Sequence, residues 1–405
     1  MFFKENFMRK TIGSALFSLM FTTALAEDWP QWGGPNRNHI SQEKGLLQKW
    51  PESGPKKLWQ VDDAGIGYAG VSIAGGKLFV MGARDGTERL IAKDVKTGKD
   101  LWAADIGPLY NNSWGDGPRG TPTVAGDFVY ATGGNGNLIA AKVADGKVVW
   151  NKEMTKDLGG EIPRWGYTES VLVEDGKVYC TPGGSKGTIA ALDAATGKLL
   201  WQSKDFSEPA EYASIMPADI NGTHQLVQLT MSWLVGVAAK DGAVLWKSPW
   251  PGRTAVIPTP VIRDNYVYIT TGYGVGSKLV KVGPNNKPED VYENKVMKNH
   301  HGGVVLLGDY LYGYSDGPGW ICQNFMTGEE VWADKSLGKG AVTYAGGRLY
   351  CLDERTATVV LAEASPKGWA EHGRFTLAPL SSKRAPRGQV WMHPVVANGQ
   401  LYLRD

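Results

Sequence analysis

The stretch ALDAATGKLLW, from Ala191 to Trp201, decides the fold because it recurs along the chain. Related stretches are AKDVKTGKDLW ending at Trp102, AAKVADGKVVW ending at Trp150, the weaker GVAAKDGAVLW ending at Trp246, and CQNFMTGEEVW ending at Trp332. Successive tryptophans are separated by 48, 51, 45 and 86 residues. A period of roughly 40 to 50 residues is typical of a repeat architecture, so 86 residues span two units.

Three further units complete the series. The segment around Tyr292 fits the degenerate unit between Trp246 and Trp332. KKLWQV at Trp59 lies 43 residues before Trp102, and AEHGRF at Phe375 lies 43 residues after Trp332. The sequence therefore predicts eight units.

Each unit also contains a hairpin signal upstream of its aromatic residue. Short β-branched and aromatic runs flank two-residue turn pairs in IAGGKLFV, VAGDFVY, VEDGKVY, IRDNYVY, LLGDYLY, YAGGRLY and VANGQLY. The Thr-Gly or Asp-Gly before each tryptophan predicts a second tight turn. Each unit is thus expected to contain four strands, and the predicted fold is an all-β, eight-bladed β-propeller of four-stranded antiparallel blades.

Both ends of the chain are expected to close the ring. KLWQV resembles the last strand of a unit whose earlier strands are missing. VWMHPVVANGQLYLRD at the C-terminus resembles the first and second strands of a unit whose last strand is missing. The predicted organisation is a signal peptide at residues 1–26, an N-terminal extension at 27–56 and the propeller at 57–405, whose last blade is short of a strand.

The first residues have the features of a secretory signal. Lys4, Arg9 and Lys10 precede an apolar run, and Ala24, Leu25 and Ala26 form an AxA cleavage site before Glu27. A membrane anchor is the alternative, but the apolar run is short for a bilayer span. We therefore expect a periplasmic or secreted protein without a transmembrane segment in its mature chain.

Composition excludes several classes of partner and architecture. The 43 Lys and Arg residues nearly balance 41 Asp and Glu residues in the 405-residue chain. Removing the predicted signal leaves a net charge of zero, which does not suit nucleic acid or an anionic membrane. The 3 cysteines cannot form a disulfide scaffold. We expect a monomer whose partner is an envelope protein, a glycan or a small anionic or planar ligand.

The AxDxxTGKxxW motif resembles the tryptophan-docking motif of pyrroloquinoline-quinone (PQQ) type propellers. DWPQWGGPNRN, from Asp28 to Asn38, is similar to the segment that opens quinoprotein alcohol dehydrogenases, and other segments resemble secreted PQQ-like repeat proteins of unassigned activity. The propeller of the outer-membrane β-barrel assembly lipoprotein is a further relative. The resemblance implies eight blades joined by stacked indole rings, so the predicted docking residues are Trp59, Trp102, Trp150, Trp201, Trp246 and Trp332.

Residues entering the innermost strand of each blade are expected to line the mouth of the channel. These segments contain aromatic and basic side chains, which suit stacking and the binding of an anionic or planar ligand. The candidate ligand-binding residues are Tyr68, Trp114, Arg119, Trp165, Tyr167, Tyr212, His300, His301, Lys339, Trp391 and His393.

A quinone site is less well supported. In the related dehydrogenases, the resemblance implies PQQ beside a disulfide of adjacent cysteines, with Ca²⁺ held by acidic and amide side chains. Cys180, Cys322 and Cys351 are not adjacent, and only Asp116, Glu169 and Asp316 are expected near the channel mouth. Ca²⁺ takes six or more oxygen ligands, so we expect neither a metal site, nor catalytic residues, nor a cofactor.

Three functions remain open. The first is a non-catalytic binding module or scaffold for a protein, glycan or small ligand, which the poor carboxylate set favours. The second is a PQQ-dependent alcohol dehydrogenase with calcium at an atypical site, favoured by the aromatic mouth with Arg119 and Lys339. The third is a scaffold for outer-membrane protein assembly. Fold alone does not decide among them.

Overall fold

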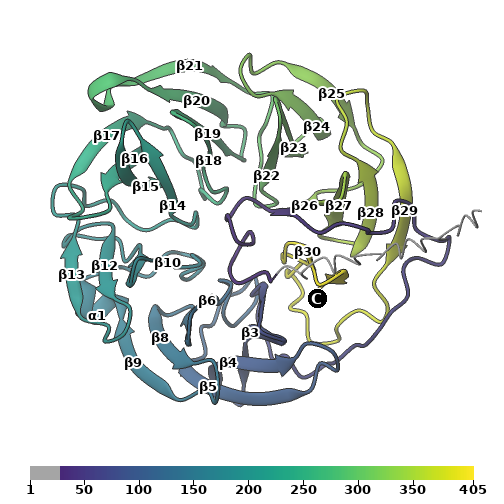
Figure 1. Cartoon of the computed structure of the whole chain (residues 1–405), viewed down its shortest axis with the longest axis horizontal. Helices are drawn as coiled ribbons and strands as arrows, with labels where there is room; N and C mark the ends of the chain where they lie inside the picture. The colour runs from purple at the N-terminus through teal and green to yellow at the C-terminus, as the bar shows by residue number, and fades with distance from the viewer. Residues whose placement is uncertain (1–27) are drawn as a thin grey trace, which may run out of the picture.

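The computed structural model describes residues 28–405, which form a ring of small β-sheets around a central axis (Figure 1). Seven of these sheets contain four antiparallel strands, and an eighth sheet contains two. The predicted signal peptide lies outside the described residues. The structure and the sequence pattern therefore agree on an all-β, propeller-like ring with four-stranded antiparallel sheets.

The strands follow the chain around the ring, and each sheet is made of consecutive strands, to which one sheet adds a strand from the N-terminal part of the chain. The first three four-stranded sheets are β2 (Val71–Ala74), β3 (Lys77–Arg84), β4 (Thr87–Asp94) and β5 (Asp100–Pro108); β6 (Thr123–Ala125), β7 (Phe128–Thr132), β8 (Asn137–Lys142) and β9 (Val148–Glu153); and β10 (Leu172–Glu174), β11 (Lys177–Cys180), β12 (Ala190–Asp193) and β13 (Leu199–Gln202). The next two are β14 (Met216–Ile220), β15 (Thr223–Leu229), β16 (Trp233–Ala238) and β17 (Val244–Pro249); and β18 (Val261–Arg263), β19 (Tyr266–Thr271), β20 (Gly276–Val282) and β21 (Pro288–Asn294).

The last sheets lie beside the chain termini. They are β22 (Val304–Leu307), β23 (Tyr310–Ser315), β24 (Gly319–Asn324) and β25 (Glu330–Asp334); β26 (Gly340–Ala345), β27 (Arg348–Asp353), β28 (Thr358–Glu363) and β29 (Glu371–Thr376); and the pair β30 (Val395–Ala397) and β31 (Gln400–Tyr402). A short strand β1 (Ile40–Ser41) adds to β26 in parallel. Within residues 28–405, helical structure is confined to α1 (Met154–Leu158) and the 3-10 turn η1 (Pro284–Asn286). None of the helices in residues 28–405 has the length and apolar character needed to cross a bilayer.

The repeated motif builds the contact between neighbouring sheets. The indole of Trp150 packs against Gly197 in the turn of the next sheet, and its Nε1 donates to the carbonyl oxygen of Ala194 at 2.9 Å. Gly197 has a φ of 70°, and a Cβ at this position would lie 2.7 Å from the Trp150 ring. The turn therefore needs glycine both for its backbone conformation and for the close approach of the ring.

The degenerate unit keeps this contact with another aromatic residue. Tyr292 packs against Gly328, and its hydroxyl donates to the carbonyl oxygen of Phe325 at 2.9 Å. The preceding tryptophan, Trp246, faces no Gly turn in this unit, and its Nε1 donates instead to Gln225 of its own sheet at 2.7 Å. A change in one motif therefore alters the docking of the neighbouring tryptophan.

The eighth sector departs from the predicted four-stranded blade. It contains only β30 and β31, and the segment around Trp59 does not form a strand. No strand of residues 28–405 lies between β31 and this segment, so the segment has no neighbour with which to form a ladder. Trp59 nevertheless docks like Trp150, because it packs against Gly98 and its Nε1 donates to the carbonyl oxygen of Val95 at 3.1 Å.

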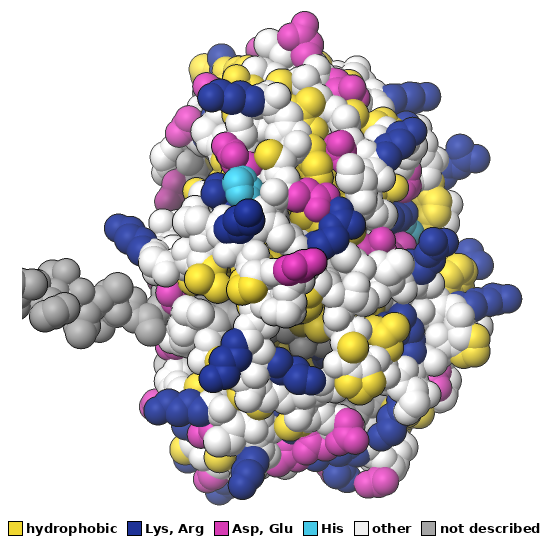
Figure 2. Space-filling model, turned by 90° about the vertical axis from the view of Figure 1, so that its right-hand side faces the viewer, with side chains coloured by type: hydrophobic (Ala, Val, Ile, Leu, Met, Phe, Trp, Pro, Cys, Tyr) yellow, Lys and Arg dark blue, Asp and Glu magenta, His cyan; other side chains and the backbone are white. Residues whose placement is uncertain are grey.

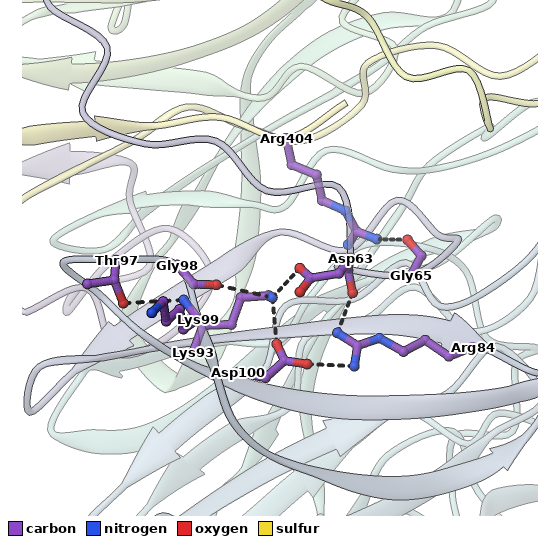
Figure 3. Close-up of polar contacts among 9 residues, drawn as sticks. All are labelled: Asp63, Gly65, Arg84, Lys93, Thr97, Gly98, Lys99, Asp100 and Arg404. Atoms are coloured by element: carbon purple, nitrogen blue, oxygen red, sulfur yellow. Dashed lines mark hydrogen bonds and ion pairs between the residues drawn. The ribbon is translucent and has the colours of Figure 1, made fainter.

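Charged side chains attach the segment before β2 and Arg404 near the C-terminus to the first sheet (Figure 3). The buried Lys93 ammonium forms ion pairs with Asp63 and Asp100, and Asp100 also pairs with Arg84 at 2.6 Å. The Arg404 guanidinium donates to the carbonyl oxygens of Gly65 at 3.0 Å, of Ala69 before β2 at 3.0 Å, and of Met81 in β3 at 2.8 Å. These contacts hold the segment around Asp63 and the side chain of Arg404 against the first sheet.

Candidate functional site: a plugged axial pocket

The N-terminal extension crosses the axis of the ring. In Figure 1 the purple segment runs across the centre before it reaches the periphery. Trp29 pairs with Ile73 of β2, the Val124 amide donates to the carbonyl oxygen of Pro30 at 2.8 Å, and β1 then joins β26 on the other side. We call residues 29–41 the plug, because they cross the axis of the ring from β2 to β26 (Figure 1).

Arg37 anchors the plug with a buried guanidinium group. Its nitrogens donate to the carbonyl oxygens of Ser170 at 2.7 Å, Val171 at 3.3 Å and Ile215 at 3.1 Å, and to Gln31 of the plug at 3.0 Å. Burial lowers the pKa of Arg37 to about 10, so the side chain stays charged at neutral pH. A buried cation needs such partners, and here backbone carbonyl groups of two sheets provide them.

The local sequence explains why the plug forms a tight loop. Gly33 and Gly34 have φ values of 72° and 81°, and the His39 amide donates to the carbonyl oxygen of Gly33 at 2.9 Å. A Cβ on Gly33 would lie 2.6 Å from the Arg37 carbonyl carbon. Arg37 and His39 also have positive φ values, 54° and 58°, which cost energy in residues other than glycine. The surrounding contacts hold these two side chains in place.

A cavity of about 270 Å³ lies at the channel mouth, with plug residues Trp32 and His39 among its walls. The structure brings nine of the eleven predicted ligand-binding residues into its lining: Tyr68, Trp114, Arg119, Trp165, Tyr212, His300, His301, Trp391 and His393. These residues precede the inner strands of different sheets, so the ring geometry gathers them around one point. We call this cavity the axial pocket.

Two predicted residues lie elsewhere. Tyr167 is buried, and its hydroxyl donates to the carbonyl oxygen of Pro182 at 2.8 Å, so it belongs to the core of its sheet. Lys339 pairs with Asp316 at 2.9 Å and is absent from the residues that line the axial pocket. Both residues precede an inner strand, as the sequence predicted, but the sequence does not determine the direction in which their side chains point.

Trp and Tyr rings from several sheets line the pocket. The centroids of Tyr68 and Trp391 are 4.8 Å apart, and those of Trp165 and Tyr212 are 5.8 Å apart. Tyr273, which the sequence did not single out, forms an oxygen-to-nitrogen contact of 2.7 Å with His300 Nε2. Its position in the turn between β19 and β20 differs from that of the other lining residues, so the search of inner-strand segments missed it.

Four histidines gather at the base of the pocket. The rings of His39 and His393 stack with centroids 4.4 Å apart, and His300 and His301 have centroids 5.0 Å apart. Burial lowers the pKa of His39 well below its usual range, and it lowers the pKa of His393 to about 4 and that of His300 to about 3. These three rings are therefore neutral at pH 7. The fourth ring, His301, contacts the Glu354 carboxylate through Nε2.

Arg119 is already engaged by the protein. Its guanidinium nitrogens donate to the carbonyl oxygens of Gly115 and Gly117, and its carbon lies 5.0 Å from the Tyr110 ring centroid and 5.6 Å from that of Tyr68. The pocket is thus less basic than its sequence indicated. Beyond Arg119, its lining offers neutral imidazoles, hydroxyl groups and aromatic faces.

Ser and Thr hydroxyl groups connect successive sheets along one wall. The Thr121 amide donates to Ser170 Oγ at 2.8 Å, the Ser170 amide to Ser214 Oγ at 3.1 Å, and the Ser214 amide to Thr259 Oγ1 at 3.0 Å. All four residues line the axial pocket. The sequence search missed them because isolated Ser and Thr residues in β-structure carry no distinctive pattern.

The residues present do not fit PQQ with Ca²⁺. Ca²⁺ needs six or more oxygen ligands, commonly from carboxylate and amide side chains. Among residues 28–405, no Asp, Glu, Asn or Gln lines the axial pocket. Nearby carboxylates are committed: Glu169 accepts from the Thr181 amide at 2.6 Å, and Asp116 accepts from the Asn112 amide at 2.7 Å. No group of three or more His, Cys, Asp and Glu in the described part of the chain could hold a metal ion.

The fold and the site define a propeller-like protein with a plugged axis and an aromatic, histidine-rich pocket at one mouth. The chain belongs to the PQQ-repeat family described as outer membrane protein assembly factor BamB, whose model matches residues 86–334. This match confirms the resemblance based on the tryptophan motif.

Individual relatives point to two kinds of protein. An outer membrane protein assembly factor BamB of Kangiella koreensis is 26% identical over 230 residues, covering 52% of this chain and 48% of that protein. A quinohemoprotein alcohol dehydrogenase of Pseudomonas putida is 32% identical over 121 residues, covering 28% of this chain and 17% of that protein. The chain thus spans about half, or less, of the length of these relatives.

A solved structure supports the fold. The crystal structure of BamB from Moraxella catarrhalis superposes with a TM-score of 0.57 at 17% identity, covering 82% of this chain and 90% of that one. At this level of identity the likeness concerns the fold alone.

Proposed function

We propose that the protein is a non-catalytic binding propeller of the cell envelope that takes a ligand in its axial pocket. The observation that carries this proposal is the convergence of nine aromatic, imidazole and guanidinium side chains from different sheets around one cavity with the plug at its base. Concave, mostly aromatic cavities with a few polar groups are typical ligand sites. Location in the periplasm or outside the cell rests on the signal predicted from residues 1–26.

The surface supports a local site over a broad charged one. On the side shown in Figure 2, Lys and Arg alternate with Asp and Glu, and hydrophobic groups are scattered among them. Such a surface creates no extended field of one sign to attract nucleic acid or an anionic membrane. Recognition by shape and stacking in the axial pocket is therefore favoured.

A ligand-observed NMR screen of ring-containing small molecules tests the proposal. Saturation transfer should identify compounds that bind the wild type, and Trp114→Ala should weaken them because Trp114 is 42% exposed and lines the pocket. Leu101→Ala is the control, since Leu101 is similarly exposed at 49% but lies on the outer strand β5. If no compound distinguishes the two variants, the axial pocket is not a ligand site.

A second candidate function is a scaffold in outer-membrane protein assembly. The match of the family model to residues 86–334 favours it. It predicts that deletion of the gene lowers the amount of β-barrel proteins in the outer membrane. A deletion strain with unchanged outer-membrane proteins would argue against this role, whereas rescue by the Trp114→Ala protein would separate it from ligand binding in the pocket.

A quinone-dependent dehydrogenase receives less support. The evidence for alcohol oxidation comes from distant relatives that match part of the chain. In the described part of the chain, the pocket lining lacks the carboxylates that a Ca²⁺-bound cofactor needs. We therefore assign no redox step to the axial pocket.

A further inference from the structure

Buried hydrogen-bonding groups without partners point to the chemistry of the ligand, provided that the proposed binding function is right. Both ring nitrogens of His39, and Nδ1 of His301 and of His393, are buried without a partner in residues 28–405. All three residues line the axial pocket. Buried polar atoms are rarely left unpaired, so these nitrogens call for a partner that the chain does not supply.

The hydrogen bond of His393 fixes what its free nitrogen can do. Nε2 lies 3.1 Å from the carbonyl oxygen of His301, and a carbonyl oxygen only accepts, so Nε2 carries the proton. Because the ring is neutral at pH 7, Nδ1 has a lone pair and can only accept. A ligand that meets His393 Nδ1 must therefore donate a hydrogen.

Other groups in the pocket, in contrast, need a hydrogen-bond acceptor from the ligand. In its neutral form His39 has one donating and one accepting nitrogen, whichever tautomer it adopts. The hydroxyl oxygens of Ser170, Ser214 and Thr259 accept backbone amides, and the described chain gives their hydrogens no acceptor. The ligand must both donate and accept, which a hydroxyl group does and a carboxylate, an acceptor only, does not.

The charge and the shape of the axial pocket restrict the class of ligand further. Arg119 is held by two backbone carbonyl groups and two aromatic rings, so its guanidinium group gives little support to the binding of an anionic ligand. Tyr68, Trp165, Tyr212 and Trp391 provide apolar ring faces around the cavity. We propose that the axial pocket binds a neutral, polyhydroxylated ring, such as a single sugar unit at the end of a glycan.

The test is binding of defined sugars to the purified protein. Titration calorimetry and saturation-transfer NMR would use glucose, galactose, mannose and N-acetylglucosamine, with glucuronate and benzoate as anionic comparisons. We expect saturable binding of at least one neutral sugar and weaker binding of both anions. His393→Phe keeps a flat ring but removes the acceptor, so it should weaken the sugar about tenfold. His224→Phe, on an outer surface beside Glu174 and Asp219, is the matched control.

Each outcome distinguishes the inference from the proposed function. Absence of binding by all four neutral sugars, or sugar binding unaffected by His393→Phe, would overturn the sugar assignment. If benzoate binds and Trp114→Ala weakens it, the pocket is a ligand site for another class, and the binding function stands. If neither these probes nor the ring-containing small molecules of the NMR screen bind, both the sugar assignment and the proposed binding function fail. Should His393→Phe not fold by circular dichroism, Thr259→Val removes a hydroxyl donor instead and should weaken the sugar severalfold.

Discussion

Substitution of Arg37 by Met should loosen the plug without dismantling the ring. Methionine has a similar length and fills the buried space, but it removes four hydrogen bonds, three of them to carbonyl oxygens of Ser170, Val171 and Ile215. Leaving a buried acceptor unpaired costs about 1–3 kcal/mol, and release of the buried charge offsets part of the sum. We expect a net loss of about 3–5 kcal/mol in the free energy that holds the plug in place.

Hydrogen exchange measured by mass spectrometry reports this loss locally. Amides of residues 29–41 should exchange faster in Arg37→Met, whereas amides of the four-stranded sheets should retain their protection. A surface substitution such as Arg263→Met, which removes a half-exposed pairing with Asp309, is the control. If the plug keeps its wild-type protection in Arg37→Met, Arg37 does not anchor it, and the account of the base of the axial pocket is wrong.

Three further predictions concern stability. Trp150→Phe should cost about 1 kcal/mol more than Trp201→Phe in urea unfolding, since the Trp150 indole donates a hydrogen bond and the Trp201 indole nitrogen is buried without a partner; equal costs would contradict this. Burial holds the pKa of His393 near 4, so the unfolded chain takes up the proton first and this residue makes stability fall between about pH 6.5 and 4. The His393→Phe protein should therefore lose less stability than the wild type over that pH range, as measured by thermal unfolding. Comparing the two proteins cancels the opposite effect of groups such as Glu169, whose pKa burial raises to about 7. Parallel curves of stability against pH would contradict this prediction. Lys93→Met should cost about 1–3 kcal/mol because two partly exposed carboxylates lose their shared cation, and an unchanged urea midpoint would contradict this.

The fold was predictable because its signals are local and repeated. Each unit contains its own turn glycine, its hairpin pair and its docking aromatic residue, so one motif could be checked against the others. Tyr292 in the degenerate unit illustrates this, since spacing alone located it and the structure gives it the docking contacts of a tryptophan. The eighth sector was harder, because the segment around Trp59 carries the motif but has no strand beside it.

The axial pocket was predictable only in part. The rule that inner-strand segments face the mouth placed residues such as Trp114 and His393 correctly, but it could not determine the side-chain directions of Tyr167 and Lys339. The plug was missed because residues 29–41 belong to no repeat. The sequence did offer the resemblance of Asp28 to Asn38 to an opening segment and the pair Gly33 and Gly34, which indicates a turn, but neither signal indicates a position on the axis.

The most direct test of the account is the state of the pocket histidines, measured by ¹⁵N NMR of the imidazole rings at pH 7 with and without a neutral sugar. We predict that His393 is neutral, protonated at Nε2 and unprotonated at Nδ1, and that the Nδ1 resonance moves toward that of a hydrogen-bonded acceptor when the sugar is added. A His393 ring that is charged at pH 7, or an Nδ1 resonance unaffected by every sugar tested, would contradict the claim that the axial pocket receives a hydroxylated ligand.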